Sequence, residues 1–189
     1  MPCSLRTRSV LKCLVPFQRT KIHDQSTLYE YAVGALARKM RSVAELKRLL
    51  RQRLPAGEES EALVEAVVAK LKDQKYLNDT AYAGAYSSYR KENQKFGRLR
   101  VVSDLKARGV HADVIAKAVG SAYAGTSEEK LAREHLRRKR MKKPANAKEA
   151  ARIFRALVRA GYTSRTIIRI LKQWDVDDEV LTVLESEQS

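Results

Sequence analysis

Apolar residues recur along this chain at intervals of three and four, the spacing that places side chains on one face of a helix. Leu99, Val102 and Leu105 form one such stripe, and a second begins at Val114. Gly109 lies between the two stripes, where the end of a helix favours a residue that accepts a positive φ. Strand-type alternation is nearly absent, so the pattern predicts an all-α protein.

The junction between these stripes is repeated. A leucine, three residues, a glycine and an apolar residue occur at 105–110 and again at 157–162, with a weaker copy at 49–54 where Arg53 replaces the glycine. The copies are about 50 residues apart, a period that suits three short helices. We therefore expect three tandem three-helix repeats at 26–77, 78–125 and 126–175, with a basic arm at 1–25 and an acidic tail at 176–189.

Helix starts and one linker can also be predicted. Ser42 with Glu45, and Thr126 with Glu129, have the spacing of a capping box, which satisfies two otherwise unpaired amides at a helix start. The small and polar residues of 120–127 predict the linker between the second and third repeats.

The net charge of +16, from 38 basic and 22 acidic residues, indicates a polyanionic partner such as nucleic acid, an acidic protein surface or a nucleoprotein. Lys and Arg are densest over 130–143, where Glu134 is the one opposing acid. This run could be a solvated helix end, but its concentration favours a binding surface.

Three tyrosines, Tyr82, Tyr86 and Tyr89, lie on one face of a predicted helix. Such a stripe could stack nucleic-acid bases. Packing within or between repeats is the interpretation we favour.

The residues that support catalysis or metal binding are not grouped in this sequence. His111 and Asp113 have no nucleophile or third partner beside them, so we interpret them as residues of a helix start. Cys3 and Cys13 form neither zinc spacing nor a disulfide framework, which fits a reducing compartment. We expect no catalytic residue, no metal and no cofactor, and therefore no enzyme.

The N-terminal residues 1–25 carry several cations and few acids. They could be an organellar transit peptide or a flexible basic arm, and we favour the arm. No apolar run approaches the roughly 20 residues that a membrane span requires, so we expect a cytoplasmic protein with no membrane partner.

Several short motifs follow one another between residues 26 and 120: Tyr31–Leu36, Arg41–Leu46, Leu71, Tyr76–Asp79, Ala81–Ala83, Gly97–Arg100, Asp104–Leu105 and Arg108–Val110. In this order and spacing they resemble the RecX family of bacterial regulatory proteins, and the likeness continues to about residue 175 as a degenerate third repeat. The basic arm, Arg53 and the strongly basic 130–143 segment depart from the family pattern.

The resemblance implies an elongated, curved array of three three-helix units that binds the filament of the RecA recombinase. It also implies restraint of strand exchange, ATP hydrolysis and co-protease activity, and we expect a monomer. The alternative is a helical repeat protein that binds single- or double-stranded DNA without sequence preference. For partner binding we select arginines from all three repeats: Arg41, Arg48, Arg98, Arg100, Arg108, Arg133, Arg137, Arg138 and Arg140.

Overall fold

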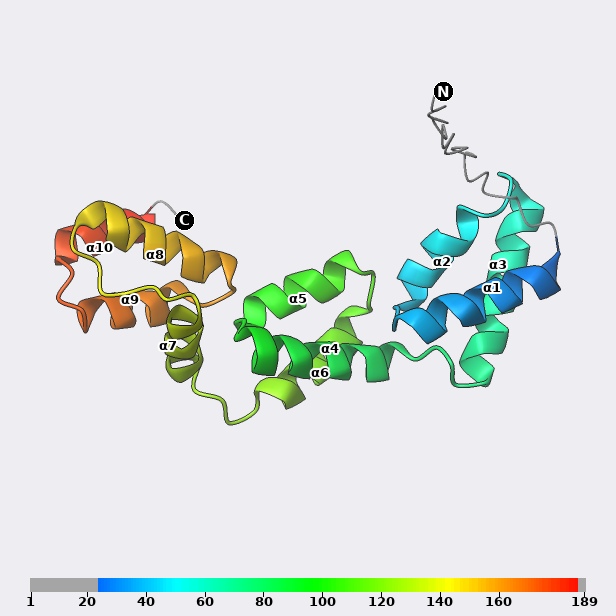
Figure 1. Ribbon diagram of the computed structural model, residues 1–189, viewed down its shortest axis with the longest axis horizontal. Coiled ribbons are helices and arrows are strands. Elements are labelled where there is room, and N and C mark those ends of the chain that lie inside the picture. The colour runs from blue at the N-terminus through cyan, green and yellow to red at the C-terminus, as the bar shows by residue number, and fades with distance from the viewer. Residues whose placement is uncertain (1–23, 187–189) are drawn as a thin grey trace, which may run out of the picture.

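The computed structural model describes residues 24–186, which form ten α-helices and no strand (Figure 1). The helices are α1 (Gln25–Arg38), α2 (Val43–Arg51), α3 (Glu58–Asp73), α4 (Asp79–Gln94), α5 (Arg98–Ala107), α6 (Ala112–Tyr123), α7 (Glu128–Arg138), α8 (Ala147–Arg159), α9 (Ser164–Lys172) and α10 (Asp178–Ser186). The predicted all-α class is confirmed. Cys3, Cys13 and nearly all of the expected arm lie outside the described residues.

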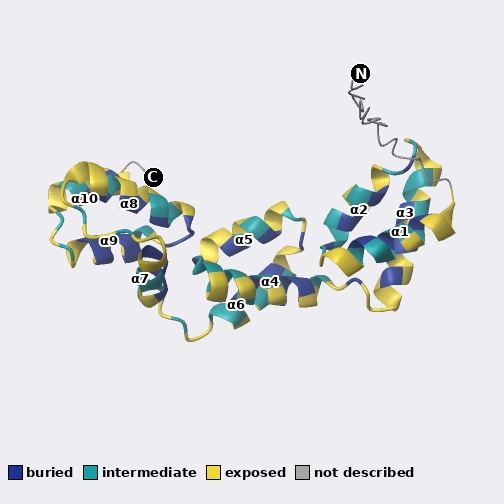
Figure 2. Cartoon of the chain, in the orientation of Figure 1, coloured by how far each residue is buried: buried dark blue, intermediate teal, exposed yellow. Residues whose placement is uncertain are grey.

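Three separate hydrophobic cores divide the helices into three units, as the buried faces in Figure 2 show. The first unit is α1–α3, around Leu46 and Val67; the second is α4–α6, around Leu105 and Val119; the third is α7–α10, around Phe154. Each unit buries its own apolar faces, as in a repeat protein whose units contact only their neighbours. The units follow one another as a curved, elongated array (Figure 1).

Local capping explains where several helices begin. The predicted capping box of α2 is confirmed: the Glu45 amide donates to Ser42 Oγ at 3.1 Å, and the Ser42 amide donates to Glu45 Oε2 at 3.2 Å. The second predicted box is wrong, because Ser127 rather than Thr126 caps α7. The linker before it is also shorter than predicted, since α6 continues to Tyr123.

The chain after residue 175 is not simply an acidic tail. It contains α10, whose Leu181 and Leu184 are buried in the core of the third unit. Asp178 and Glu179 lie in the first turn of α10, where negative charge suits the helix dipole. The third unit therefore has four helices rather than three.

The middle helices α2, α5 and α8 meet end to end along the array. The C-terminal end of α5 contacts the N-terminal end of α2, and the C-terminal end of α8 contacts the N-terminal end of α5. The glycines of the repeated sequence motif lie at these two contacts, which we call the first joint and the second joint. All three helices lie toward the concave side of the array in Figure 1.

Candidate interaction surface

The arginines selected from the sequence do not form one continuous face. Arg41, Arg48 and Arg108 lie near the first joint, Arg98 and Arg100 open α5 at the second joint, and the others belong to α7 and its C-terminal end. Arg48, Arg98, Arg100, Arg137, Arg138 and Arg140 are exposed, whereas Arg41, Arg108 and Arg133 are half-buried.

Arg108 holds the first joint together. Its guanidinium pairs with the Glu45 carboxylate and lies over the Tyr86 ring, 4.9 Å from the ring centroid. Ser42 Oγ donates to the Arg108 carbonyl oxygen at 2.6 Å, and the Val43 amide donates to an Asp79 carboxylate oxygen at 2.8 Å. Because these contacts occupy Arg108 within the chain, we assign it to the joint rather than to a partner-binding surface.

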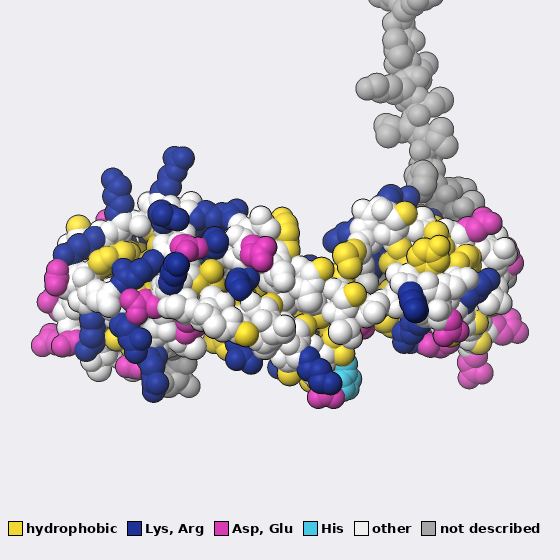
Figure 3. All heavy atoms as spheres, turned by 90° about the horizontal axis from the view of Figure 1, so that it is seen from below, with side chains coloured by type: hydrophobic (Ala, Val, Ile, Leu, Met, Phe, Trp, Pro, Cys, Tyr) yellow, Lys and Arg dark blue, Asp and Glu magenta, His cyan; other side chains and the backbone are white. Residues whose placement is uncertain are grey.

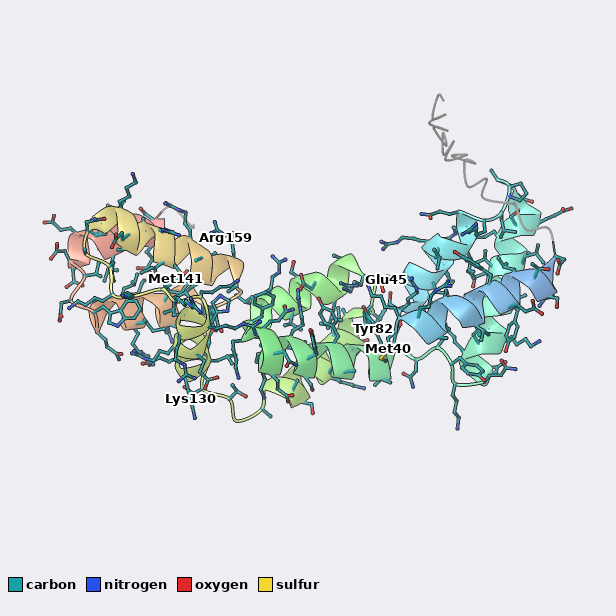
Figure 4. The ribbon with its side chains drawn as sticks, viewed as in Figure 1. Met40, Glu45, Tyr82, Lys130, Met141 and Arg159 are labelled. Carbon is teal, nitrogen blue, oxygen red and sulfur yellow. The ribbon has the colours of Figure 1, made fainter. Side chains whose placement is uncertain are left out.

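Tyr82 approaches the same carboxylate from α4, as Figure 4 shows for Tyr82 and Glu45. The Tyr82 hydroxyl lies 3.4 Å from Glu45 Oε2, and only 5% of the residue is exposed. Burial raises the pKa of Tyr82, and the negative charge of Glu45 raises it further. Glu45 therefore has three structural roles, as a cap of α2, as the ion partner of Arg108 and as an acceptor for Tyr82.

A second charged group lies inside the second unit, around Asp104. Burial opposes the negative charge of Asp104, but hydrogen bonds from Arg90 and Tyr86 outweigh it and keep its pKa below the usual range. Arg100 also pairs with Asp104 at 3.0 Å, one helical turn away. Arg100 is thus partly neutralised within the chain.

Arg98 differs from Arg100. It is exposed, and it pairs with no acidic residue in the described part of the chain. It occupies the first turn of α5, which contains no acidic residue, so its charge is unfavourable next to the positive end of the helix dipole. Its neighbour Leu99 is 55% exposed, and both line a cavity of about 280 Å³ together with Tyr123 and Leu131.

The second joint is made by backbone contact. The Gly97 amide donates to the Ala160 carbonyl oxygen at 2.8 Å, and the Leu99 amide donates to the Gly161 carbonyl oxygen at 3.2 Å. A Cβ atom on Gly161 would lie 2.2 Å from the Arg100 amide nitrogen, and one on Gly97 would lie 2.1 Å from the Gly161 oxygen. Only residues without a side chain allow this approach.

Side chains of the third unit also bind the segment that leads into α5. His135 Nδ1 lies 3.2 Å from the Gln94 carbonyl oxygen, and the Tyr162 hydroxyl donates to the Lys95 carbonyl oxygen. Burial lowers the pKa of His135, although hydrogen bonding to backbone carbonyl oxygens favours its charged form. Nδ1 donates to the Gln94 carbonyl oxygen, because a carbonyl oxygen can only accept.

Of the three units, the third has the largest excess of Lys and Arg over Asp and Glu, and Figure 3 shows Lys and Arg gathered over it. Arg133 pairs with Glu129 at 3.0 Å, but Arg137, Arg138 and Arg140 are exposed. The sequence analysis missed a further set on α8. The missed residues are Arg152, Arg155 and Arg159, and their spacing of three and four on the face opposite Phe154 could have revealed them.

The tyrosine stripe of α4 serves mainly in packing. Tyr82 is buried, Tyr86 is half-buried and donates to Asp104 at 3.0 Å, and Tyr89 is 56% exposed.

Among residues 24–186, no group of three His, Cys, Asp or Glu side chains has the arrangement of a metal site. None of the helices in that range is both long and apolar enough to span a membrane.

Three small helical units joined end to end define a helical repeat protein, with cationic side chains beside the joints and over the third unit. The model of the second three-helix domain of RecX matches residues 78–119, the span of the second unit. The chain is 33% identical to the regulatory protein RecX of Leptothrix cholodnii over 151 residues, which cover 80% of this chain and 91% of that protein. The chain belongs to the RecX family of regulatory proteins.

Other comparisons agree with this assignment. The regulatory protein RecX of Pseudomonas fluorescens is 30% identical over 171 residues, covering 90% of this chain and 99% of that one. The crystal structure of RecX from Lactobacillus salivarius superposes with a TM-score of 0.61 at 20% identity, over 80% of this chain and 96% of that chain. Another crystal structure of a regulatory protein RecX gives a TM-score of 0.65 at 20% identity, over 79% of this chain and 73% of that chain. At these identities the two structures support the fold.

Proposed function

We propose that this protein binds the filament of a RecA-type recombinase in the cytoplasm and restrains strand exchange, ATP hydrolysis and co-protease activity, without chemistry of its own. The partner follows from the family resemblance. The relatives are named regulatory proteins, which supports a regulatory rather than a catalytic role.

The shape of the chain is compatible with a polymeric partner. Three units with separate cores follow one another, and each presents a middle helix toward the concave side (Figure 1). Quasi-equivalent units at regular intervals can contact successive protomers of a filament, which are themselves equivalent. A protein that binds one filament state more tightly than another shifts the filament toward that state, so inhibition requires only differential affinity.

The observation that carries the proposal is the exposed position of Arg98 in the first turn of α5. A cation at the positive end of α5 is unfavourable for the free chain, and Arg98 forms no ion pair with a described acid. Residues that lower local stability are expected at functional surfaces. Leu99 beside it offers an exposed apolar side chain next to a cavity, the combination found at the energetic centre of many protein interfaces.

We expect Arg98→Glu to weaken inhibition of the recombinase's ATPase at least about tenfold in dose, which corresponds to about 1.4 kcal/mol. The substitution places an acid in the first turn of α5, so the variant should be as stable as the parent or slightly more stable. Dose–response curves and urea unfolding of both proteins test this. Arg165→Glu on α9, also exposed, is the matched control and should inhibit normally. Unchanged inhibition by the Arg98 variant would exclude this residue from the contact.

A further inference from the structure

An open cavity of about 260 Å³ lies at the turn between α7 and α8, and its lining is mainly cationic. Its charged lining residues are Lys139, Arg140, Lys142, Lys143, Arg152 and a single acid, Glu149. We propose that this cavity, continued by the exposed arginines of α8, binds the phosphate groups of a nucleic-acid backbone. This inference goes beyond the proposed function and does not depend on it, because nucleic acid alone tests it.

Most of the positive charge at the cavity has no partner within the described chain. Lys143 pairs with Asp175 at 2.7 Å, and Glu149 Oε2 already accepts a hydrogen bond from the Ala145 amide at 2.8 Å. The remaining cations, Lys139, Arg140, Lys142 and Arg152, form no ion pair with a described acid. Several like charges around one hollow repel one another, and an anion with several acceptor oxygens would relieve this repulsion.

The arginines of α8 extend the cationic cavity along the helix. Arg152, Arg155 and Arg159 are exposed and lie on one face, because residues three, four and seven apart share a side of a helix. Arg159 lies at the end of α8 that faces the second unit (Figure 4). The 13 residues of α8 extend about 20 Å, which matches about six phosphates of one strand of duplex DNA.

The composition of this surface fits nucleic acid better than protein. The large hydrophobic side chains most exposed among the described residues are Met40, Tyr76, Tyr89, Leu99 and Val183, and none lies on α7, α8 or their connecting turn. Protein interfaces have an apolar, charge-depleted core, whereas interfaces with DNA are polar and strongly positive. The cavity and the arginines that follow it have the second character.

Arg140 allows a test that leaves the fold intact. Its φ of 54° is in the left-handed region, which glycine enters without strain, so Arg140→Gly removes the charge without lowering stability. Lys75 has a φ of 62° after α3 in the first unit and is also exposed, so Lys75→Gly is a change of the same kind far from the cavity. Both residues have the left-handed conformation because they follow the ends of helices. They differ in that Arg140 lines the cavity and Lys75 does not.

The experiment measures binding of fluorescent single-stranded and duplex DNA of about 20 nucleotides, longer than a typical single-strand site of about 4–16. Fluorescence anisotropy is recorded between about 50 and 200 mM salt for the full chain, for Arg140→Gly with Arg152→Gln, and for Lys75→Gly with Arg38→Gln. The cavity variant should bind at least one form of DNA about tenfold or more weakly, with a salt slope smaller by about 1.4 for single strands. The first-unit variant should bind like the parent.

Two results would overturn the inference. Equal weakening by the cavity variant and the first-unit variant would mean that only overall charge matters. Displacement of the DNA by polyglutamate at the same charge concentration would mean that any acidic polymer, including an acidic protein, fills the surface. Unfolding curves that coincide for the cavity variant and the parent exclude loss of structure as the cause.

Discussion

Replacing Gly161 with valine should destabilise the protein by at least about 3 kcal/mol and separate the third unit from the second. The φ of Gly161 is 88°, which a β-branched residue resists, and its Cβ would lie 2.2 Å from the Arg100 amide nitrogen. Backbone atoms cannot move aside as the end of a long side chain can. Urea unfolding measures the loss of stability, and small-angle X-ray scattering measures the change in shape.

Two further glycine variants separate the causes of this effect. Gly97→Ala introduces no backbone strain, because its φ of −72° suits alanine, yet the new Cβ would lie 2.1 Å from the Gly161 oxygen. It should therefore open the second joint by collision alone. Gly84→Ala lies within α4 with no atom within 4 Å of the new Cβ, and it should stabilise the protein by about 0.5–1 kcal/mol. A Gly161→Val protein as stable as the parent would refute the close backbone contact.

Removal of the Glu45 carboxylate should cost about 2 kcal/mol and loosen the first joint. Glu45→Ala removes the reciprocal cap of α2, leaves half-buried Arg108 without its ion partner and deprives the Tyr82 hydroxyl of an acceptor. Glu45→Gln keeps a side chain that can reach the Ser42 amide but lacks the charge. It should cost about 1 kcal/mol, the part that belongs to the ion pair.

The matched control for Glu45 is Glu61→Ala, which removes another carboxylate paired with an arginine. The Glu61 and Arg51 side chains are 46% and 48% exposed, whereas those of Glu45 and Arg108 are 19% and 28% exposed. Water screens the exposed pair, so this change should cost clearly less stability than Glu45→Ala. Equal unfolding free energies for the Glu45 and Glu61 variants would show that the first joint does not depend on this carboxylate.

Local features of the structure could be predicted from the sequence. The spacing of Ser42 and Glu45 predicted the start of α2, and Gly109 and Gly161 were expected to follow the ends of helices, as they do in the left-handed conformation. These signals act within one helical turn, so a few neighbouring residues determine them.

The contacts between units could not be predicted in this way. Gly109 stands where a Cβ would lie 2.5 Å from that of Ala44, and Gly161 touches Arg100, pairs that are far apart in sequence. Arg108 was selected as a partner-binding residue because it is basic and follows a helix, but only the folded chain places it against Glu45. No local pattern distinguishes an arginine that joins two units from one that faces solvent.

The end of the chain was expected to be an acidic tail, but it contains a helix that packs into the core of the third unit. Asp177 and Asp178 were interpreted as part of an acidic tail at 176–189, although Leu181 and Leu184 have the spacing of a buried helical face. An ion pair of 2.8 Å between Lys172 and Asp178 connects α10 to α9. The acids mark the start of a helix, and the leucines that follow complete the core of the third unit.

The most direct test of the central proposal is DNA-dependent ATP hydrolysis by the cognate recombinase in the presence of this protein. The amount added should be far below both the number of recombinase protomers and the amount needed to cover the DNA. The proposal predicts strong suppression under these conditions, because a chain that contacts successive protomers can block a filament at few positions. Suppression that appears only at DNA-saturating amounts would contradict it and would mean that the protein competes for DNA.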